Sequence, residues 1–556
     1  MPKVHASLPF RLWYLFLLLP FFAGGFHTCF CAVIAAVLLM ELIMEYSKNG
    51  SLKITINPAS ILCFSMMLGY AVTPLWAADK GMAVFGILRC LPVLLLALLL
   101  MQISPEEVEH SLLLLPICGS LMTAISCIFL LFPGLTDSVT INGRLSGFLQ
   151  YPNSFAAFLL AGIVVQGTKQ THRKFDWLVS VILICGIFLS GSRTGILLLM
   201  AALLSLTLLR RKISPAVCCI LIAGIFLLCG ILWKSHERIT FLGRDMGSLL
   251  IRILYYKDAL PVILKHPFGL GYLGYRALET TFQTSRYTVS FVHSSLLQIL
   301  LDVGWIPAFL YLFALGKTVC SRQIPDRKKG LLLFLSLHCM VDFDLEFFLF
   351  WSILLMCMDF QTGRVYHLKR KAIIGCIAVP ALTIAMWLGL GDLLYRSGQI
   401  DAAGKVVPFH TDALSAALQT TSDPDELDAL SDKILALNPV HALSYSAKAN
   451  AAFARGHIDD MIHYKECAIR YNPYAIEEYC DYIKKLYLVT ERYLASGDQR
   501  SAEFCLQKIL SIPDQLDRIA SKTDPLAYQT GNDTSMELPE AYQMLLDALK
   551  ETNKPS

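Results

Sequence analysis

Long apolar runs are the feature that most constrains this chain. Through the first 395 of 556 residues they recur between short polar loops, and each is close to the roughly 20 residues that a helix needs to cross a bilayer. The runs are continuous rather than alternating, which disfavours membrane strands. Only 16% of the residues are charged, against about 25% in soluble domains. The sequence therefore predicts an all-α, polytopic membrane helical bundle.

We expect about 12 to 13 spans on this criterion. They lie near residues 12–25, 26–45, 57–74, 82–101, 111–133, 153–168, 177–192, 195–209, 215–233, 294–316, 331–345, 346–361 and 372–391.

The basic loops predict how the spans are oriented. Four such loops fall on one side of the bundle, and basic loops mark the cytoplasmic side. They are residues 169–174, 210–212, 322–329 and 364–371. The opposite, outer face then carries residues 134–152, 190–195 and 234–293. An odd number of spans also predicts that the C-terminal domain is extracytoplasmic.

The long outer loop at 234–293 is itself basic. Between residues 234 and 286 it holds eight lysines and arginines against four acidic residues. Such a loop favours an anionic ligand, for example a phosphate, although long loops also cross membranes regardless of their charge. The stretch 251–264 predicts an amphipathic helix at the membrane surface.

A composition change at residue 396 predicts a second domain. We assign residues 1–395 to the membrane domain and residues 396–556 to a soluble helical domain. The pair Asn438-Pro439 recurs as Asn472-Pro473, 34 residues later, which is the period of tetratricopeptide repeats. Such repeats form a concave docking surface and predict a protein partner. A plain helical bundle is the alternative.

Polar residues at the predicted outer ends of spans are candidates for function. Arg193 lies between two apolar runs, where an arginine is costly unless it faces a cavity or a partner; the alternative is an arginine that reaches the lipid headgroups. His293 follows the basic loop, and Asn153 is placed to cap the span that it precedes. Asp342 belongs to a group of three acids near His338, which need partners or water at this depth.

Five short motifs in this region, the first in two parts, resemble the O-antigen ligase and polymerase superfamily. They occur within residues 140–360, in the order seen in that superfamily. They are Gly-Arg-Leu-Ser-Gly-Phe at 143–148, Tyr-Pro-Asn at 151–153, Ser-Gly-Ser-Arg-Thr-Gly at 190–195, His-Pro-Phe-Gly-Leu-Gly-Tyr at 266–272, His-Ser-Ser-Leu-Leu-Gln at 293–298 and His-Cys-Met-Val-Asp-Phe-Asp at 338–344.

The resemblance implies a glycosyltransferase of the bacterial cytoplasmic membrane that uses neither a metal nor another cofactor. Its donor would be an oligosaccharide on an undecaprenyl-diphosphate carrier, and its acceptor a second glycan at the outer face. Membrane lipid is a further expected partner, and nucleic acid is not.

The resemblance also implies roles for individual residues. Arg193 and His293 match a catalytic arginine and histidine, and Arg252 matches a second arginine, with Arg244 as its competitor. The histidine of the superfamily is usually followed by Asn or Asp, whereas Ser294 follows it here. Further expected substrate-binding residues are Arg144, Asn153, Arg244, Arg276 and Asp342.

Several functions remain open at this level. A polymerase joins repeat units, whereas a ligase attaches a finished glycan to a lipid or protein, and residues 341–344 resemble capsular-type polymerases. A transporter or flippase would place its polar residues at the bilayer midplane, whereas here they gather at one face. A membrane scaffold would leave Arg193 and His293 without a role.

Overall fold

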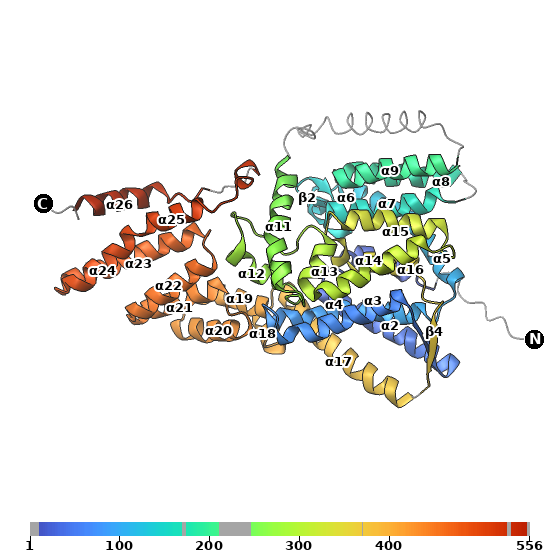
Figure 1. The fold of residues 1–556 in the computed structure, drawn as a ribbon, viewed down its shortest axis with the longest axis horizontal. Coiled ribbons are helices and arrows are strands. Elements are labelled where there is room, and N and C mark those ends of the chain that lie inside the picture. The colour runs from blue at the N-terminus through green and yellow to red at the C-terminus, as the bar shows by residue number, and fades with distance from the viewer. Residues whose placement is uncertain (1–10, 170–173, 211–245, 370, 531–534, 553–556) are drawn as a thin grey trace, which may run out of the picture. The chain divides into compact units, whose positions relative to one another are not determined.

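The computed structural model describes residues 11–169, 174–210, 246–369, 371–530 and 535–552 (Figure 1). The expected span at 215–233, residues 234–245 of the outer loop and Arg244 lie outside these residues. The chain divides into two compact units. Unit 1 takes its described residues from Met1–Val72, Phe85–Leu242 and Val292–Leu393, and unit 2 from Thr73–Val84, Gly243–Phe291 and Leu394–Ser556.

Five helical segments of the described chain are long and apolar enough to cross a membrane. They are Thr28–Asn49 (α2), Pro58–Leu75 (α3, Pro58–Val72, with η3, Thr73–Leu75), Lys80–Leu100 (α4), Pro105–Phe129 (α5, Pro105–Leu112, with α6, Leu115–Phe129) and Gly375–Arg396 within α17 (Lys371–Arg396). Shorter apolar helices are α7 (Pro152–Gly167), Arg193–Leu206 within α9 (Arg193–Arg210), α14 (Trp305–Cys320) and α16 (Phe348–Cys357). The predicted all-α, multi-pass class is confirmed, and the number of crossings stays a prediction.

Glycines interrupt two of the expected spans among the described residues. Residues 12–25 form only the short turns α1 (Tyr14–Leu17), η1 (Leu19–Phe21) and η2 (Ala23–Gly25). Pro20 and two glycines with positive φ angles, Gly24 and Gly25, break the helix there. The run 294–316 is split at Gly304, whose φ is 85°, into α13 (Ser295–Val303) and α14.

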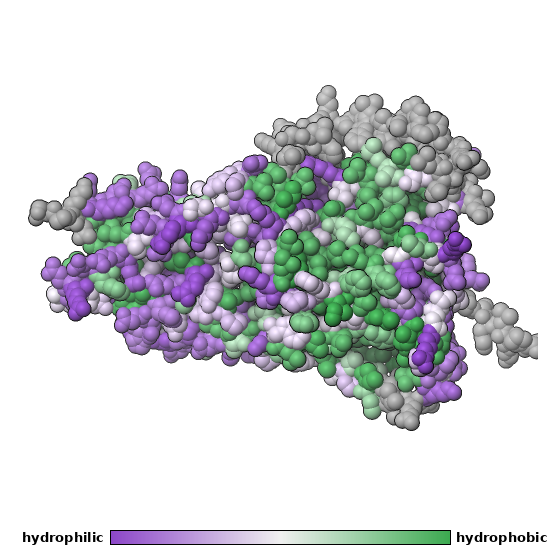
Figure 2. Space-filling model, viewed as in Figure 1, coloured by the Kyte–Doolittle hydropathy of each residue, from purple (hydrophilic) through white to green (hydrophobic). Residues whose placement is uncertain are grey.

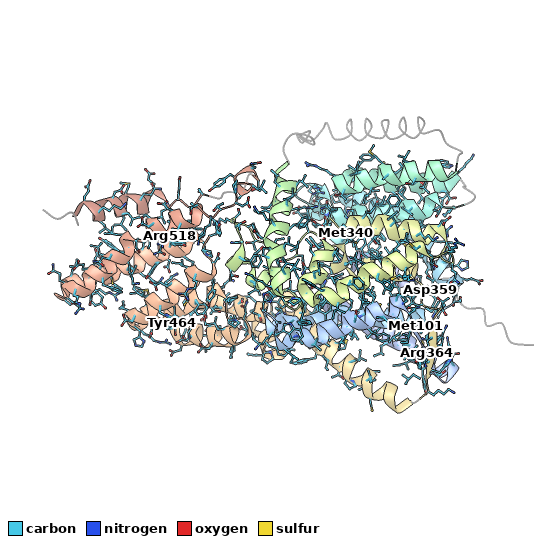
Figure 3. All side chains as sticks on the ribbon, viewed as in Figure 1. Met101, Met340, Asp359, Arg364, Tyr464 and Arg518 are labelled. Carbon is cyan, nitrogen blue, oxygen red and sulfur yellow. The ribbon has the colours of Figure 1, made fainter. Side chains whose placement is uncertain are left out.

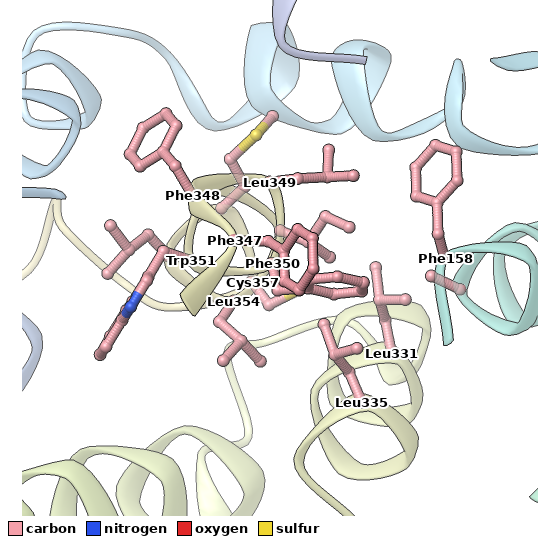
Figure 4. Close-up of a cluster of buried hydrophobic side chains, with 14 of the residues drawn as sticks. Phe158, Leu331, Leu335, Phe347, Phe348, Leu349, Phe350, Trp351, Leu354 and Cys357 are labelled. Atoms are coloured by element: carbon pink, nitrogen blue, oxygen red, sulfur yellow. The ribbon is translucent and has the colours of Figure 1, made fainter. Parts of the chain in front are cut away.

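The core of unit 1 surrounds α16, in which every residue is buried. A helix that is apolar on all sides is typical of the centre of a membrane bundle. Figure 4 shows Phe347, Phe350 and Leu354 beside two side chains of α15 (Asp326–Cys339), Leu331 and Leu335. Because lipid is as apolar as the core, tight packing rather than exclusion of water holds these helices together.

Short antiparallel strand pairs and α8 (Lys174–Ser190) complete unit 1. β1 (Leu52–Ile56) pairs with β4 (Arg364–Leu368), and β2 (Thr140–Ile141) pairs with β3 (Arg144–Leu145). Figure 2 shows hydrophobic residues gathered over the helices of unit 1 on this face, with hydrophilic residues at the end that carries β4. Such a surface is expected of a bundle whose sides face lipid.

Unit 2 combines part of the long loop with the C-terminal helices. The loop contributes α11 (Met246–Lys265) and α12 (Gly274–Phe282), so the predicted helix at 251–264 is confirmed, while its place on the membrane surface stays a prediction. The other helices are α18 (Ile400–Val406), α19 (Thr411–Thr420), α20 (Pro424–Leu437), α21 (Ala442–Arg455), α22 (Ile458–Tyr471), α23 (Ile476–Ala495), α24 (Gln499–Leu510), α25 (Ile512–Ala520), η7 (Ala527–Gln529) and α26 (Glu540–Thr552).

Short turns connect consecutive helices from α20 to α24. Each Asn-Pro pair follows a helix, with Asn438 ending α20 and Asn472 ending α22. Gly456 ends α21 in the left-handed conformation, with φ of 77°. This alternation of helices and turns favours the repeat interpretation, which stays a prediction.

Glu279 of α12 makes the stability of unit 2 depend on pH. Its side chain is buried and accepts a hydrogen bond from the Val289 N–H at 2.7 Å. Burial raises the pKa of this carboxyl from 4.5 to about 8. The folded protein therefore keeps a proton that the unfolded chain releases, so this contribution is fully present below pH 4.5 and is lost as the pH rises through 8.

Glu279→Gln is expected to remove this pH dependence, because the amide stays neutral. The variant should gain thermal stability relative to the wild type at pH 8 more than at pH 5. Melting of the purified full chain at both pH values, followed by intrinsic fluorescence, measures the difference. The same shift at both pH values would contradict the assignment to Glu279.

Candidate functional site

A tight hairpin carries Arg144. Its two-residue turn is Asn142-Gly143, with φ angles of 52° and 71°. Positive φ at both positions defines the turn that matches the twist of a hairpin, and Asn-Gly is its preferred sequence. The local sequence thus explains why Arg144 extends from β3.

Arg144 joins the turn at 190–195 to the start of α7. Its Nε donates to the Ser190 carbonyl at 2.8 Å, and its Nη2 donates to Asn153 Oδ1 at 2.8 Å. Gly191 has a φ of 60°, and a Cβ atom there would lie 3.4 Å from Arg144 Nε. A glycine at 191 therefore allows both the left-handed backbone and the close approach of the guanidinium.

The prediction that Asn153 caps α7 is wrong. The N-cap residue is Tyr151, and Pro152 takes the first helical position, where its fixed φ and missing N–H suit a helix start. Asn153 follows it, with its side chain turned to other partners. Asn153 Nδ2 donates to Asp342 Oδ2 at 2.7 Å while Oδ1 accepts from Arg144.

His293 lies two residues before α13. Ser294 is the N-cap of that helix and accepts a hydrogen bond from the Leu297 N–H. Serine, asparagine and aspartate are all preferred N-cap residues. Ser294 therefore provides a preferred N-cap for α13.

Asp342 lies at the centre of the candidate site, among Arg144, Tyr151 and Asn153, and faces His293. Its Oδ1 is 3.2 Å from His293 Nδ1 and accepts a hydrogen bond from the Tyr151 hydroxyl at 2.9 Å. Asp342 is 1% exposed, whereas the His293 side chain is 18% exposed. A buried carboxylate facing Nδ1 favours the proton on that nitrogen, which leaves Nε2 as the basic nitrogen.

Hydrogen bonds from Ser295 hold Asp342 close to His293. The N–H and the hydroxyl of Ser295 both donate to the Asp342 carbonyl at 2.9 Å, which fastens the start of α13 to the loop at 340–343. The Phe343 ring packs against the Tyr151 ring in a tilted arrangement, with centroids 4.6 Å apart, and meets the His293 ring edge to face. Contacts with Asp342 and with the Phe343 ring thus orient the imidazole of His293.

The other two acids of the group have partners, as their depth requires. Asp344, in η6 (Asp344–Glu346), accepts from the Ser154 hydroxyl at 2.7 Å and is 2.6 Å from His338 Nδ1. Glu346 pairs with Arg89 of α4, whose Nη2 lies 3.0 Å from Glu346 Oε2. These contacts fix the loop that presents Asp342.

The structure brings together four of the predicted site residues. Hydrogen bonds run without a gap from the Ser190 carbonyl through Arg144, Asn153 and Asp342 to His293. Arg193 begins α9, three residues after Ser190, with an exposed side chain.

The remaining arginines belong to unit 2. Arg252 is on α11, and Arg276 of α12 forms an ion pair with Asp412 of α19 at 2.5 Å. Their grouping with His293 stays a prediction.

Tyr151 and Arg89 were not among the predicted site residues. Tyr151 belonged to one of the quoted motifs, but nothing in the sequence says that its hydroxyl reaches Asp342. A lone arginine in the apolar run 82–101 was a signal that could have drawn attention to Arg89, because such residues need a partner in a membrane.

Unit 1 is thus a polytopic helical membrane bundle with a partly exposed histidine held by a buried aspartate. The family model of the O-antigen ligases matches residues 178–312, from α8 into α14, a segment that includes Arg193, Arg252 and His293. This match confirms the resemblance to the O-antigen ligase superfamily and supports a role in bacterial polysaccharide biosynthesis. No curated protein matches the chain.

Proposed function

We propose that the chain transfers an oligosaccharide from an undecaprenyl-diphosphate carrier to a hydroxyl group of an acceptor glycan. The reaction takes place at the outer face of the bacterial cytoplasmic membrane. The observation that carries the proposal is the pair of His293 and Asp342, because it supplies a positioned base within the cluster that includes the turn before Arg193.

In the proposed reaction the acceptor hydroxyl attacks the anomeric carbon of the donor. His293 Nε2 takes the hydroxyl proton while the new glycosidic bond forms. The bond between the anomeric carbon and the phosphate oxygen breaks, and the electron pair leaves with the carrier diphosphate. Arg193 and Arg252 hold that diphosphate, because guanidinium groups bind phosphate oxygens in pairs and stabilise the charge that develops on them.

Asp342 acts through His293 rather than on the substrate. Its carboxylate orients the imidazole and stabilises the positive charge that appears when Nε2 is protonated. Arg144 and Asn153 position Asp342, since each is used within the hydrogen-bonded chain. We therefore propose that Arg144 and Asn153 act as positioning residues.

Among glycosyl transfers, polymerisation of repeat units is favoured by residues 341–344, which resemble capsular-type polymerases. Polymerisation and ligation use the same donor and differ in the acceptor, so their products distinguish them. Incubation of the purified full chain with a lipid-linked oligosaccharide should give longer glycan on the carrier. Glycan moved to another acceptor would indicate a ligase, and recovery of unchanged donor would contradict transfer.

A further inference from the structure

A cavity lies at the other end of unit 1, away from the candidate site. It has a volume of about 470 Å³ and opens between the start of α5, the residues before α15 and the end of α16. Its wall is mainly apolar. The apolar lining includes Leu100, Ile103, Val108, Leu355, Met356 and Phe360.

Lys328 is the unusual residue of this cavity. It lines the cavity and is 6% exposed. Within the described parts of the chain, its ammonium group makes no hydrogen bond or ion pair. A cation in a mainly apolar cavity without a protein partner is costly, and a cation in the first turn of α15 is also opposed by the helix dipole.

The acidic groups nearby are engaged elsewhere or exposed, although one buried oxygen of Glu109, Oε2, has no hydrogen-bond partner. Glu109 pairs with Arg327 at 2.5 Å, and the Asp359 carboxylate accepts from the backbone of Gln361 and Thr362. Glu106 is exposed at the rim. None of the three forms an ion pair with Lys328.

The cavity is distant from the candidate site around His293 and Asp342. Lys328 and His338 are ten residues apart on α15, which corresponds to roughly 15 Å along a helix. Figure 3 shows Met101 and Asp359 at one end of unit 1 and Met340 toward the other. The loop at 322–329 is one of those predicted to face the cytoplasm.

We infer that this cavity binds an anionic phospholipid, with the lipid phosphate on the Lys328 ammonium and an acyl chain against the apolar wall. The anion supplies the opposite charge that Lys328 lacks as a partner, and the start of α15 offers backbone N–H groups to the same phosphate. A free phosphate would satisfy only the cation, whereas a lipid also covers the apolar residues. On the predicted orientation, the lipid comes from the inner leaflet.

The test compares Lys328→Met with Lys329→Met in the purified full chain. Both variants lose one positive charge and keep an unbranched side chain, but Lys329 is more exposed and lies 3.9 Å from Asp326. Native mass spectrometry measures the binding of phosphatidylglycerol, of phosphatidylcholine with the same chains, and of inorganic phosphate. We expect phosphatidylglycerol to bind about tenfold more weakly to Lys328→Met and unchanged to Lys329→Met.

Three results would overturn the inference. They are unchanged lipid binding by Lys328→Met, equal weakening in both variants, and binding of inorganic phosphate as tight as that of the lipid. The last result would identify a site for a free anion.

Thermal melting without lipid provides a second readout. Lys328→Met should melt a few degrees higher than the wild type, because the mainly apolar cavity no longer holds an unpaired charge, and phosphatidylglycerol should no longer stabilise it. A lower melting temperature, or failure to fold, would show that Lys328 has a structural partner and would contradict the inference. In the wild type, the lipid should slow hydrogen exchange at 323–328 and 355–362 but not at 190–195.

Discussion

His293→Ala is expected to lower glycan transfer by about 10²- to 10⁴-fold, which is the usual contribution of a positioned general base. The acceptor hydroxyl would then have to lose its proton to water in the transition state. The measurement is the rate of product formation from a lipid-linked oligosaccharide by purified, detergent-solubilised protein. Since the imidazole is partly exposed and precedes α13, its removal leaves the helix cap at Ser294 intact.

His457→Ala is the matched control for this experiment. His457 has an exposed side chain in unit 2 and lies 3.9 Å from Asp460, so its loss removes an imidazole without touching the cluster. Both variants should insert and melt like the wild type. Wild-type product levels from His293→Ala would reject its role as the base.

Asp342→Asn is expected to reduce kcat by up to about 10⁴-fold, by analogy with the aspartate–histidine pair of serine proteases. The amide keeps the shape of the side chain but removes the charge that stabilises a protonated imidazole. Its NH₂ group can also donate to Nδ1, which would move the ring proton to Nε2 and block the base. Because Asp342 does not act on the substrate in the proposed reaction, KM should change by less than about threefold.

Tyr151→Phe is the control for the aspartate variant. It removes one of the hydrogen bonds to Asp342 Oδ1 and retains the ring that packs against Phe343. We expect less than a tenfold loss in kcat, and partial activity in Asp342→Glu, which keeps the charge. A loss in Tyr151→Phe as large as that in Asp342→Asn would mean that the cluster collapses, and would contradict a specific role for the carboxylate.

Several local features of the site could be predicted from the sequence. Asn142-Gly143 specifies the hairpin that carries Arg144, and Ser294 is a typical N-cap before the apolar run of α13. Gly24, Gly25 and Gly304 also mark in the sequence where two expected spans are interrupted. These features depend on neighbours in the chain, so short sequence windows contain them.

The sequence by itself determined the membrane class, the helical core and the motifs, because burial in lipid requires long apolar helices whatever their neighbours are. Only the tertiary structure decided that the Asn153 side chain donates a hydrogen bond to Asp342 instead of capping α7. It also decided that the Tyr151 hydroxyl and His293 contact the same carboxylate oxygen of Asp342. The contacts of Asn153 and Tyr151 with Asp342 join residues 189 and 191 positions apart in the chain. A distant contact of this kind depends on how helices pack, which hydropathy and motif spacing do not encode.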